Sequence, residues 1–310
     1  MTSKVFKTLE EQVEILESKG LVIKDVERAK EILLRENYFF INGYRHVFLK
    51  QDVNRNFIEG ATFEEMYALF QFDRQLRNII FKNLLIVENN YKSIVSYVLS
   101  RNYGYKERDY LRVENFTQDK SRTRQVNDLI RKMKRQIRVN GGQHSATLHY
   151  INNYGYIPLW IVVKVLSFGI ISEVFSILKE KDKEEISDIF MIDSYSLEEY
   201  LPILANYRNL CAHEDILYDH FTQRSISDTT YHRQLNIDKM DDEYIYGKND
   251  IFALIIILKQ LLSKDDFKMM MNEIAYDLDV LDAKIDSVDM SKILDKMGFP
   301  SNYKDITFIS

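Results

Sequence analysis

The chain has 310 residues, of which 45% are apolar and 29% are charged, a balance typical of a globular protein. It contains only 10 Gly and 3 Pro, which favours long helices and argues against a loop-rich all-β fold. Aromatic residues make up 13%, enough ring surface for a sizeable core, so the composition excludes disorder over most of the chain. The net charge of −5 indicates no overall preference for a polyanion.

The single cysteine, Cys211, excludes an internal disulfide framework and a cysteine-based structural zinc site, and it fits a reducing compartment. The first residues, MTSKVFKTLEEQVE, contain no apolar stretch of signal-peptide length. The two most apolar segments, 157–178 and 251–262, contain charged residues and predict buried core helices rather than membrane spans. We therefore expect a cytoplasmic protein that does not contact a membrane.

Two helices are predicted in the first 35 residues. Thr8 with Glu11 forms a capping-box pattern at the start of the first, and Asp25 caps the second. Residues 37–49 are densely aromatic and are expected to form a packed turn. The rings expected in the core are Phe39, Phe40, Tyr44 and Phe48.

A long helical segment follows. Thr62 with Glu65 forms another capping box, and no Gly or Pro interrupts the chain from there to Ser100. Apolar residues recur close to a 3.6-residue period, which predicts one long helix or two nearly continuous ones, ending at Gly104.

Residues 119–140 form a local excess of positive charge, with eight basic and two acidic residues in an acidic chain. The segment is predicted to be a helix that ends at Gly141–Gly142, and His144 and His149 follow in a short polar loop. Such a basic face is either a phosphate-binding surface or an ordinary solvated helix face, and the sequence leaves both readings open.

The second half of the chain is also predicted to be helical. Pro158 opens an apolar helix that ends near Leu178, residues 179–188 read as a charged connector, and residues 219–249 as a polar surface loop. Further helices are predicted at about 250–262, at about 265–285 and immediately before residues 297–303.

Between the connector and the polar loop, Ser196 with Glu199 predicts a helix N-terminus, with Pro202 tolerated in the first turns. This helix carries the segment with the most informative chemistry, Arg208, Asn209 and His213 in the pattern R-N-x-x-x-H. Phosphate-loop, dinucleotide-binding, HExxH and esterase-serine motifs do not occur, and the six histidines lack metal-ligand spacing.

An arginine offers a permanent planar cation for a phosphate, and a histidine can exchange a proton near neutral pH. Asn209 and His213 are four residues apart, so on a helix the amide can orient the imidazole. Arg208 and His213 lie about 140° apart around a helix. They converge if the arginine reaches around, if the helix ends near His213, or if a second copy supplies the rest. A structural role is the alternative, because an arginine and a histidine at this spacing are common.

The chemistry suited to these residues is metal-independent RNA cleavage. RNA carries its own nucleophile, the 2′-hydroxyl, so a histidine needs only to move protons while an arginine stabilises charge on the scissile phosphate. DNA lacks that hydroxyl and is expected to be spared. Cys211 is expected to be a small buried residue rather than a nucleophile, and Glu88 is expected to pair with Lys92.

The R-N-x-x-x-H run resembles the motif of the HEPN ribonuclease superfamily. The chain further resembles its abortive-infection branch of the AbiD/AbiF type in five segments that span most of residues 36–303. These segments are YFFINGYRHVF (38–48), FDRQLRNIIFKNLLIVENNYKS (72–93), HYINNYGYIPLWIVVKVLSFGIIS (149–172), YRNLCAHEDILYD (207–219) and MGFPSNY (297–303).

The resemblance implies an all-α, HEPN-like helical bundle with additional N- and C-terminal helices. The expected single domain, 1–310, comprises a helical extension (1–60), a bundle (61–262) and C-terminal helices (263–310). The resemblance also implies a homodimer in which two motifs form one composite site, and endoribonuclease activity in phage defence or as a toxin, with no metal or cofactor.

Carried over by position, the resemblance makes Arg208 and His213 the catalytic pair and Asn209 the orienting residue. One departure is Lys164, close to a position where an acidic residue is expected in many relatives. If that carboxylate has a role, the role is absent here or has moved.

Relatives of this type are restrained by an antitoxin, in related systems a small non-coding RNA. A helix with a basic face can bind such an RNA, and Tyr103, Tyr105 and Tyr154 lie near it in sequence and can stack on bases. The residues expected to bind RNA are Arg122, Arg124, Arg131, Lys132, Lys134, Arg135, Arg138 and His144. The alternatives to a ribonuclease are a non-catalytic helical RNA-binding module and, third, a helical DNA-binding regulator.

Overall fold

The computed structural model describes residues 5–51 and 53–309. The fold is all-α, as the composition predicts: 67% of the chain is helical, and a two-stranded hairpin is the sheet structure found within the described residues. No helix among those residues is both long enough and apolar enough to cross a bilayer.

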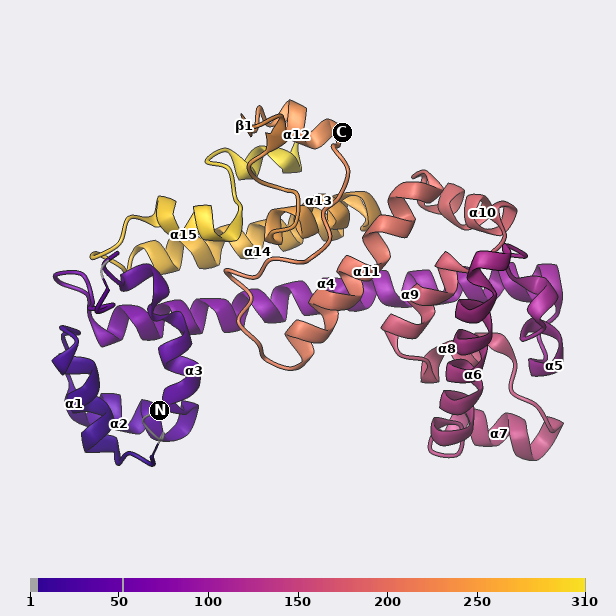
Figure 1. The fold of residues 1–310 in the computed structure, drawn as a ribbon, viewed down its shortest axis with the longest axis horizontal. Coiled ribbons are helices and arrows are strands. Elements are labelled where there is room, and N and C mark those ends of the chain that lie inside the picture. The colour runs from indigo at the N-terminus through magenta and orange to yellow at the C-terminus, as the bar shows by residue number, and fades with distance from the viewer. Residues whose placement is uncertain (1–4, 52, 310) are drawn as a thin grey trace.

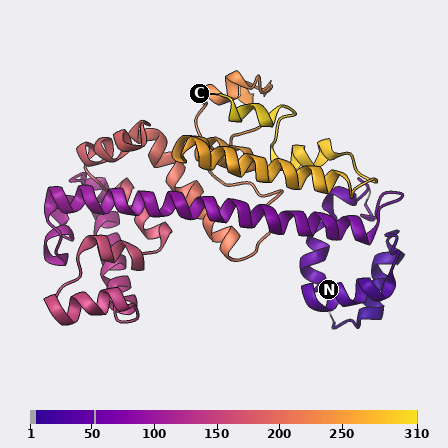
Figure 2. The ribbon, with the colours of Figure 1, turned by 180° about the vertical axis from the view of Figure 1, so that it is seen from behind.

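One helix, α4 (Phe63–Tyr103), is the spine of the molecule (Figure 1). Its 41 residues contain no Gly or Pro, the Thr62–Glu65 capping box closes its first turn, and Gly104 ends it with a φ of +89°. The segment is thus a single helix, about 60 Å long at 1.5 Å per residue. The antiparallel α14 (Lys264–Asp282) lies alongside it in both views (Figures 1 and 2). Between them and α11 lies α13 (Ile251–Leu261), with its first eight residues fully buried.

The N-terminal lobe consists of residues 9–48 and packs at the start of α4. The capping predictions are confirmed, since Thr8 and Asp25 each accept a backbone hydrogen bond at the expected helix ends. Tyr44 and Phe48 are buried as expected, but the core prediction is wrong for Phe39 and Phe40, which are 76% and 55% exposed. They lie in a helix of five residues that turns only Ile41 inward. The lobe contains α1 (Leu9–Ser18), α2 (Val26–Glu36), α3 (Tyr38–Asn42) and the 3-10 helix η1 (Gly43–Phe48).

The distal lobe consists of residues 107–165 and packs at the other end of α4. The expected helix from Pro158 to near Leu178 is wrong as a single element: it breaks between Val165 and Phe168. Leu166 is extended there, and the Ser167 hydroxyl accepts from the Ile170 amide, which starts a new helix. The elements are α5 (Glu107–Tyr110), η2 (Val113–Asn115), η3 (Lys120–Arg122), α6 (Thr123–Asn140), α7 (Ser145–Tyr154), α8 (Leu159–Val165) and, beyond the lobe, α9 (Phe168–Ser176).

The expected charged connector 179–188 is also wrong, because it lies in a helix, α10 (Glu180–Phe190). The helix that carries the R-N-x-x-x-H run is α11 (Ser194–Ala212), and its N-cap is Asp193 rather than Ser196. The Ser196 hydroxyl donates to the Asp193 carboxylate at 2.6 Å, while Asp193 accepts from the Ser196 amide at 2.8 Å. Pro202 is therefore the ninth helical residue and not part of the first turn.

The remaining segments cover α13 and α14. The predicted polar loop is largely irregular, but it is anchored by His232, which is fully buried and hydrogen-bonded to the Gly247 carbonyl at 2.8 Å. The expected C-terminal helices are present. The elements are α12 (Thr230–Gln234), β1 (Lys239–Met240), β2 (Glu243–Tyr244), α15 (Met290–Met297) and η4 (Tyr303–Thr307).

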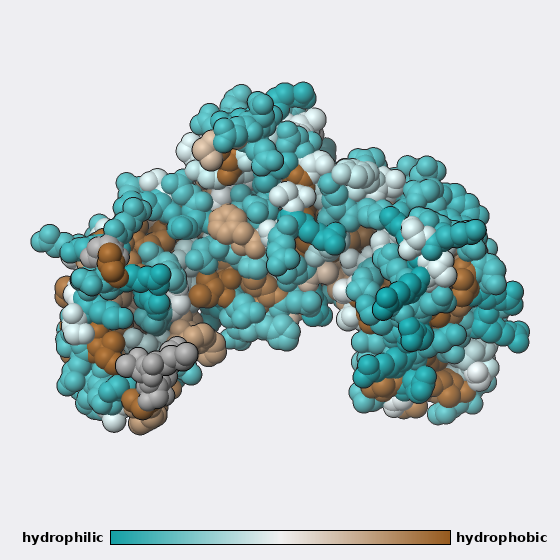
Figure 3. Space-filling model, viewed as in Figure 1, coloured by the Kyte–Doolittle hydropathy of each residue, from teal (hydrophilic) through white to brown (hydrophobic). Residues whose placement is uncertain are grey.

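The whole molecule has the shape of an arch. The two lobes project from the ends of α4 toward the same side, and Figure 3 shows the surface hollowed between them. α11 crosses α4, and its C-terminal end lies in this hollow in both ribbon views (Figures 1 and 2). The end of the R-N-x-x-x-H helix is therefore displayed on the concave side.

Candidate functional site

Arg208 lies on the face of α11 that meets α4. Its Nε donates to Glu88 Oε2 at 3.1 Å, and its guanidinium carbon lies 5.8 Å from the centre of the Phe81 ring. Both partners belong to α4. The Arg208 side chain is 31% exposed, so part of it reaches solvent. The Nε contact fixes the side chain. The two terminal nitrogens have no hydrogen-bonding partner in the part of the chain that the structure describes, and they form the edge that suits a phosphate.

Glu88 is shared between two cations. Lys92 Nζ contacts its other oxygen at 2.6 Å, so the predicted pairing of Glu88 with Lys92 is confirmed. Lys92 also donates to the Leu166 carbonyl at 2.9 Å, which ties α4 to the break between α8 and α9. The link to Arg208, 120 residues away, was missed, because only packing of α11 against α4 brings the two side chains together. The one sequence signal was a carboxylate on the apolar face of a long helix.

Asn209 and His213 are both exposed. The helix ends at Ala212, and His213 is its C-cap, with its amide bonded to the Asn209 carbonyl at 3.0 Å. Glu214 then takes a positive φ of 58°, which turns the chain away. One of the three conditions for convergence is thereby met, since the helix ends beside His213. Within residues 5–51 and 53–309, however, no hydrogen bond or ion pair joins Arg208, Asn209 and His213 through their side chains.

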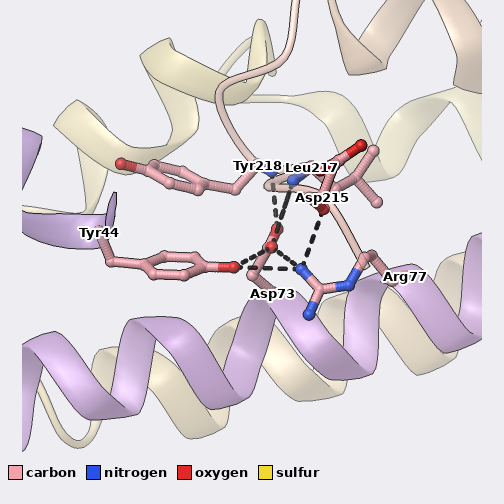
Figure 4. A network of polar contacts seen from close by, with 6 residues as sticks. All are labelled: Tyr44, Asp73, Arg77, Asp215, Leu217 and Tyr218. Carbon is pink, nitrogen blue, oxygen red and sulfur yellow. Dashed lines mark hydrogen bonds and ion pairs between the residues drawn. The ribbon is translucent and has the colours of Figure 1, made fainter. Parts of the chain in front are cut away.

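A buried network fixes the segment after His213 (Figure 4). The fully buried Asp73 carboxylate on α4 accepts from the Leu217 and Tyr218 amides, at 3.2 and 2.7 Å. Arg77, one turn later, pairs with Asp73 and donates to the Asp215 carbonyl at 3.3 Å.

The Tyr44 hydroxyl completes this network by donating to Asp73 at 2.6 Å, while its ring stacks on Tyr218. Three elements distant in sequence therefore meet at Asp73: η1, α4 and the segment that leaves α11. Together they set the position of the α11 C-terminus.

Cys211 lies between Arg208 and His213 in sequence but on the buried side of α11, with 7% of its surface exposed. Burial raises the pKa of its thiol to about 12. A thiol with so high a pKa is a poor nucleophile at neutral pH.

The predicted RNA-binding residues of α6 fall into two groups. In the first, the cations are paired: Arg124 and Arg131 share Asp128, and Lys132 contacts Glu173 of α9 at 2.7 Å. Arg122 donates to the Ser176 carbonyl and lies 3.8 Å from Glu198. The positive charge of these four side chains is therefore partly offset by carboxylates and a carbonyl of the protein itself.

In the second group, Lys134, Arg135, Arg138 and His144 are exposed, and their side chains have no hydrogen-bonding or ionic partner in the part of the chain that the structure describes. All four belong to the C-terminal part of α6 or the turn after it. The opposite face of the helix is buried through residues such as Val126, Met133 and Ile137. In Figure 3 the surface over α6 is mostly hydrophilic.

The stacking candidates differ in the same way. Tyr103 already has partners within the protein, because its hydroxyl donates to Asp182 and two lysines lie over its ring. Tyr105 and Tyr154 are 41% and 57% exposed and remain open to a base. Lys164 is exposed near the end of α8. Among residues 5–51 and 53–309, no cluster of three or more His, Cys, Asp or Glu side chains is arranged to hold a metal ion.

A family model described as Abi-like protein matches residues 31–219. The chain belongs to this Abi-like family. The match covers more than half of the chain and includes the N-terminal aromatic segment, all of α4, the distal lobe and α11 with its R-N-x-x-x-H run. Membership in the Abi-like family points to abortive infection, a form of phage defence. No curated protein and no solved structure matches the chain.

Proposed function

We propose that this Abi-like protein is a metal-independent endoribonuclease of the HEPN type that acts in phage defence or as the toxin of a toxin–antitoxin pair. The observation that carries the proposal is the pair of side chains at the end of α11. Arg208 is held by Glu88 through Nε alone, and His213 stands exposed at the helix terminus on the concave side of the arch.

In the reaction, the ribose 2′-oxygen forms a bond to phosphorus while the bond from phosphorus to the 5′-oxygen breaks. His213 takes the 2′-hydroxyl proton or gives a proton to the leaving 5′-oxygen, and Arg208 stabilises the charge on the phosphate oxygens. The products are a 2′,3′-cyclic phosphate and a 5′-hydroxyl. Asn209, one turn before His213, orients the imidazole once RNA is bound.

A second copy of the chain completes the site in this proposal. In a single chain Arg208 is tied to α4 while His213 is the C-cap of α11, and within the described residues no side-chain hydrogen bond or ion pair joins them. Two arches that meet through their α11 ends would place the arginine of one copy near the histidine of the other. A small RNA bound by the unpaired cations of α6 is the proposed restraint on this activity.

The test compares the wild-type chain with His213→Ala on a labelled single-stranded RNA in EDTA, and on the matched 2′-deoxy strand. We expect the wild type to cut only the RNA, and His213→Ala to lose at least 100-fold in rate while circular dichroism shows an unchanged fold. His46→Ala, which removes another exposed histidine, is the control and should cut normally.

Cleavage of RNA by His213→Ala at the wild-type rate would refute the assignment. If the wild type binds RNA but never cuts it, the unpaired cations of α6 make a non-catalytic RNA-binding module the better account. Equal action on the deoxy strand would also be incompatible with attack by a 2′-hydroxyl.

A further inference from the structure

A groove of about 830 Å³ lies in the distal lobe, between α5, α6 and the segment after α7. Its volume is within the range of ligand-binding clefts. Four cations line it, two of which, Arg108 and Arg112, lie outside the basic helix and were not singled out by the sequence. The charged and aromatic residues of its lining are Glu107, Arg108, Arg112, Lys134, Arg138 and Tyr156.

The cations of the groove are available to a ligand. Arg108 and Arg112 are 77% and 62% exposed, and among residues 5–51 and 53–309 their one acidic partner is Asp109, at 3.9 and 3.4 Å. Lys134 and Arg138 have no ionic partner within the described residues. An excess of cations over carboxylates in a concave site favours a ligand with several phosphates.

A continuous row of aromatic rings passes the groove. Tyr156 lines it, and neighbouring ring centres along the row are 5.4 to 6.3 Å apart. Most of these rings are exposed, and Lys106 lies over Tyr156 at 4.9 Å. The rings in order are Trp160, Tyr105, Tyr156, Tyr154, Tyr150 and His149.

A row of rings beside a groove of cations is the arrangement with which proteins hold single-stranded nucleic acid, because bases stack on the rings while phosphates contact the cations. A free nucleotide needs one ring, and a duplex keeps its bases stacked inside. Six rings in a row therefore favour a strand of several nucleotides. Glu107, a half-buried acceptor in the same lining, suits a ribose hydroxyl or a base amine.

We propose that this groove and its ring row bind a single-stranded RNA segment, with phosphates on Arg108, Arg112, Lys134 and Arg138 and bases on the rings from Tyr105 to Tyr154. The inference rests on the proposed function for the choice of RNA, and it adds a binding site separate from Arg208 and His213. Arg124 and Arg131 share Asp128 much as Arg108 and Arg112 share Asp109, but they do not line the groove and are outside the site.

The experiment measures binding of a fluorescent 12-nucleotide single-stranded RNA to the full-length His213→Ala chain, so that cleavage cannot interfere. Neutralising two groove cations, Arg108→Gln with Arg138→Gln, should weaken binding at least ten-fold and flatten the slope of log affinity against log salt by about 1.4, at 0.7 per phosphate contact. The control is the double variant Arg124→Gln with Arg131→Gln. It also removes two positive charges, both of them on α6 and belonging to the two partners of Asp128, and it should weaken RNA binding less than three-fold.

The rings are tested separately. Tyr154→Leu and Tyr105→Leu should each weaken binding at least five-fold, whereas Tyr276→Leu, which removes a 68% exposed ring on α14, should not. ATP and a blunt RNA hairpin serve as competitors and should compete at least ten-fold more weakly than the unlabelled strand.

Equal losses for the two double variants would overturn the groove as the site. Competition by ATP as strong as that by the strand would instead indicate a small-nucleotide pocket, and competition by the hairpin a duplex-binding face; either overturns the inference. Cleavage by the wild-type chain is measured in parallel. A strand bound in the groove but never cut refutes the proposed function alone, whereas normal cutting with no effect of the groove variants refutes the groove alone.

Discussion

Glu88 gives the candidate site its geometry. Its side chain is 6% exposed, and its carboxylate pairs with Arg208 from α11 and with Lys92 from its own helix. Two cations share one anion, so the local charge stays positive while the arginine is held in place. An orienting carboxylate that leaves the terminal guanidinium nitrogens free lowers the entropic cost of clamping a phosphate.

Replacing Glu88 by Gln should therefore slow catalysis without greatly weakening substrate binding. The amide still accepts from Nε but no longer attracts the guanidinium by charge, so we expect kcat for RNA cleavage to fall about ten-fold, with KM within about two-fold. Steady-state kinetics on a short RNA measure this. Glu273→Gln, which breaks the exposed pair with Lys82, is the control and should leave kcat unchanged. A normal kcat for Glu88→Gln would show that Arg208 needs no orientation.

Sequence reasoning predicts residues for the candidate site, but it finds only some of the partners that hold them. Arg208, Asn209 and His213 were found from residue chemistry and resemblance, and the Glu88–Lys92 pair from i,i+4 spacing. The Glu88–Arg208 pair was not, because it spans 120 positions and depends on how two helices pack. Likewise, nothing in the local pattern distinguishes Arg131, which pairs with Asp128, from Lys134, which does not.

At the scale of elements, the helix boundaries that were predicted well are those fixed by local hydrogen bonds. The Thr8 and Thr62 capping boxes close within three residues and need no tertiary partner. The helix α10 was missed because seven of its eleven residues are charged. Two of those charged residues are buried by distant partners: Lys183 contacts Glu198 of α11 at 2.7 Å, and Asp182 accepts from Asn102 at 2.9 Å.

The Asp73 network is the element-scale contact that matters most for the site, because it joins α4 to the segment leaving α11. Removing the carboxylate in Asp73→Ala leaves Arg77, 5% exposed, without its counter-charge and two amides without an acceptor. We expect the free energy of unfolding to fall by about 3–5 kcal/mol, measured by urea denaturation.

Two further variants test whether the loss comes from the buried charge. The double variant Asp73→Leu with Arg77→Met removes both charges and should recover part of the loss, because no buried charge is then left unpaired. Asp228→Ala removes a 52% exposed carboxylate that pairs with Lys248 and Lys239, and it should cost less than about 1 kcal/mol. An equally small loss for Asp73→Ala would mean that the network does not hold the segment in solution.

At the scale of the whole molecule, the unbroken α4 fixes how far apart the two lobes stand and leaves a hollow between them (Figure 3). The end of α11 is displayed in that hollow, and α9 packs against both α11 and α6. The proposed catalytic pair and the proposed RNA groove are thus linked through packed helices rather than through flexible chain. The sequence predicted most of the long helices but not the arch, because an arch depends on the directions in which helices leave the ends of α4.

If two copies share the site, two inactive chains can complement each other. Arg208→Ala and His213→Ala should each be inactive alone, whereas a co-expressed, co-purified mixture should regain measurable RNA cleavage in EDTA, because one mixed dimer retains an intact arginine and an intact histidine across the interface. Sedimentation should give twice the mass of one chain. A mixture as inactive as its parts would argue that each chain acts alone.

The protected thiol of Cys211 makes the arch directly measurable. It is the only sulfhydryl in the sequence, and its high pKa keeps it protonated, so maleimide dyes have little to attack in the native protein. Cysteines introduced at Phe39 in the N-terminal lobe and at Gly142 in the distal lobe would carry dyes selectively. Energy transfer between the dyes would then report the distance across the hollow before and after an RNA strand binds. Cys211 would not have to be replaced to prevent background labelling.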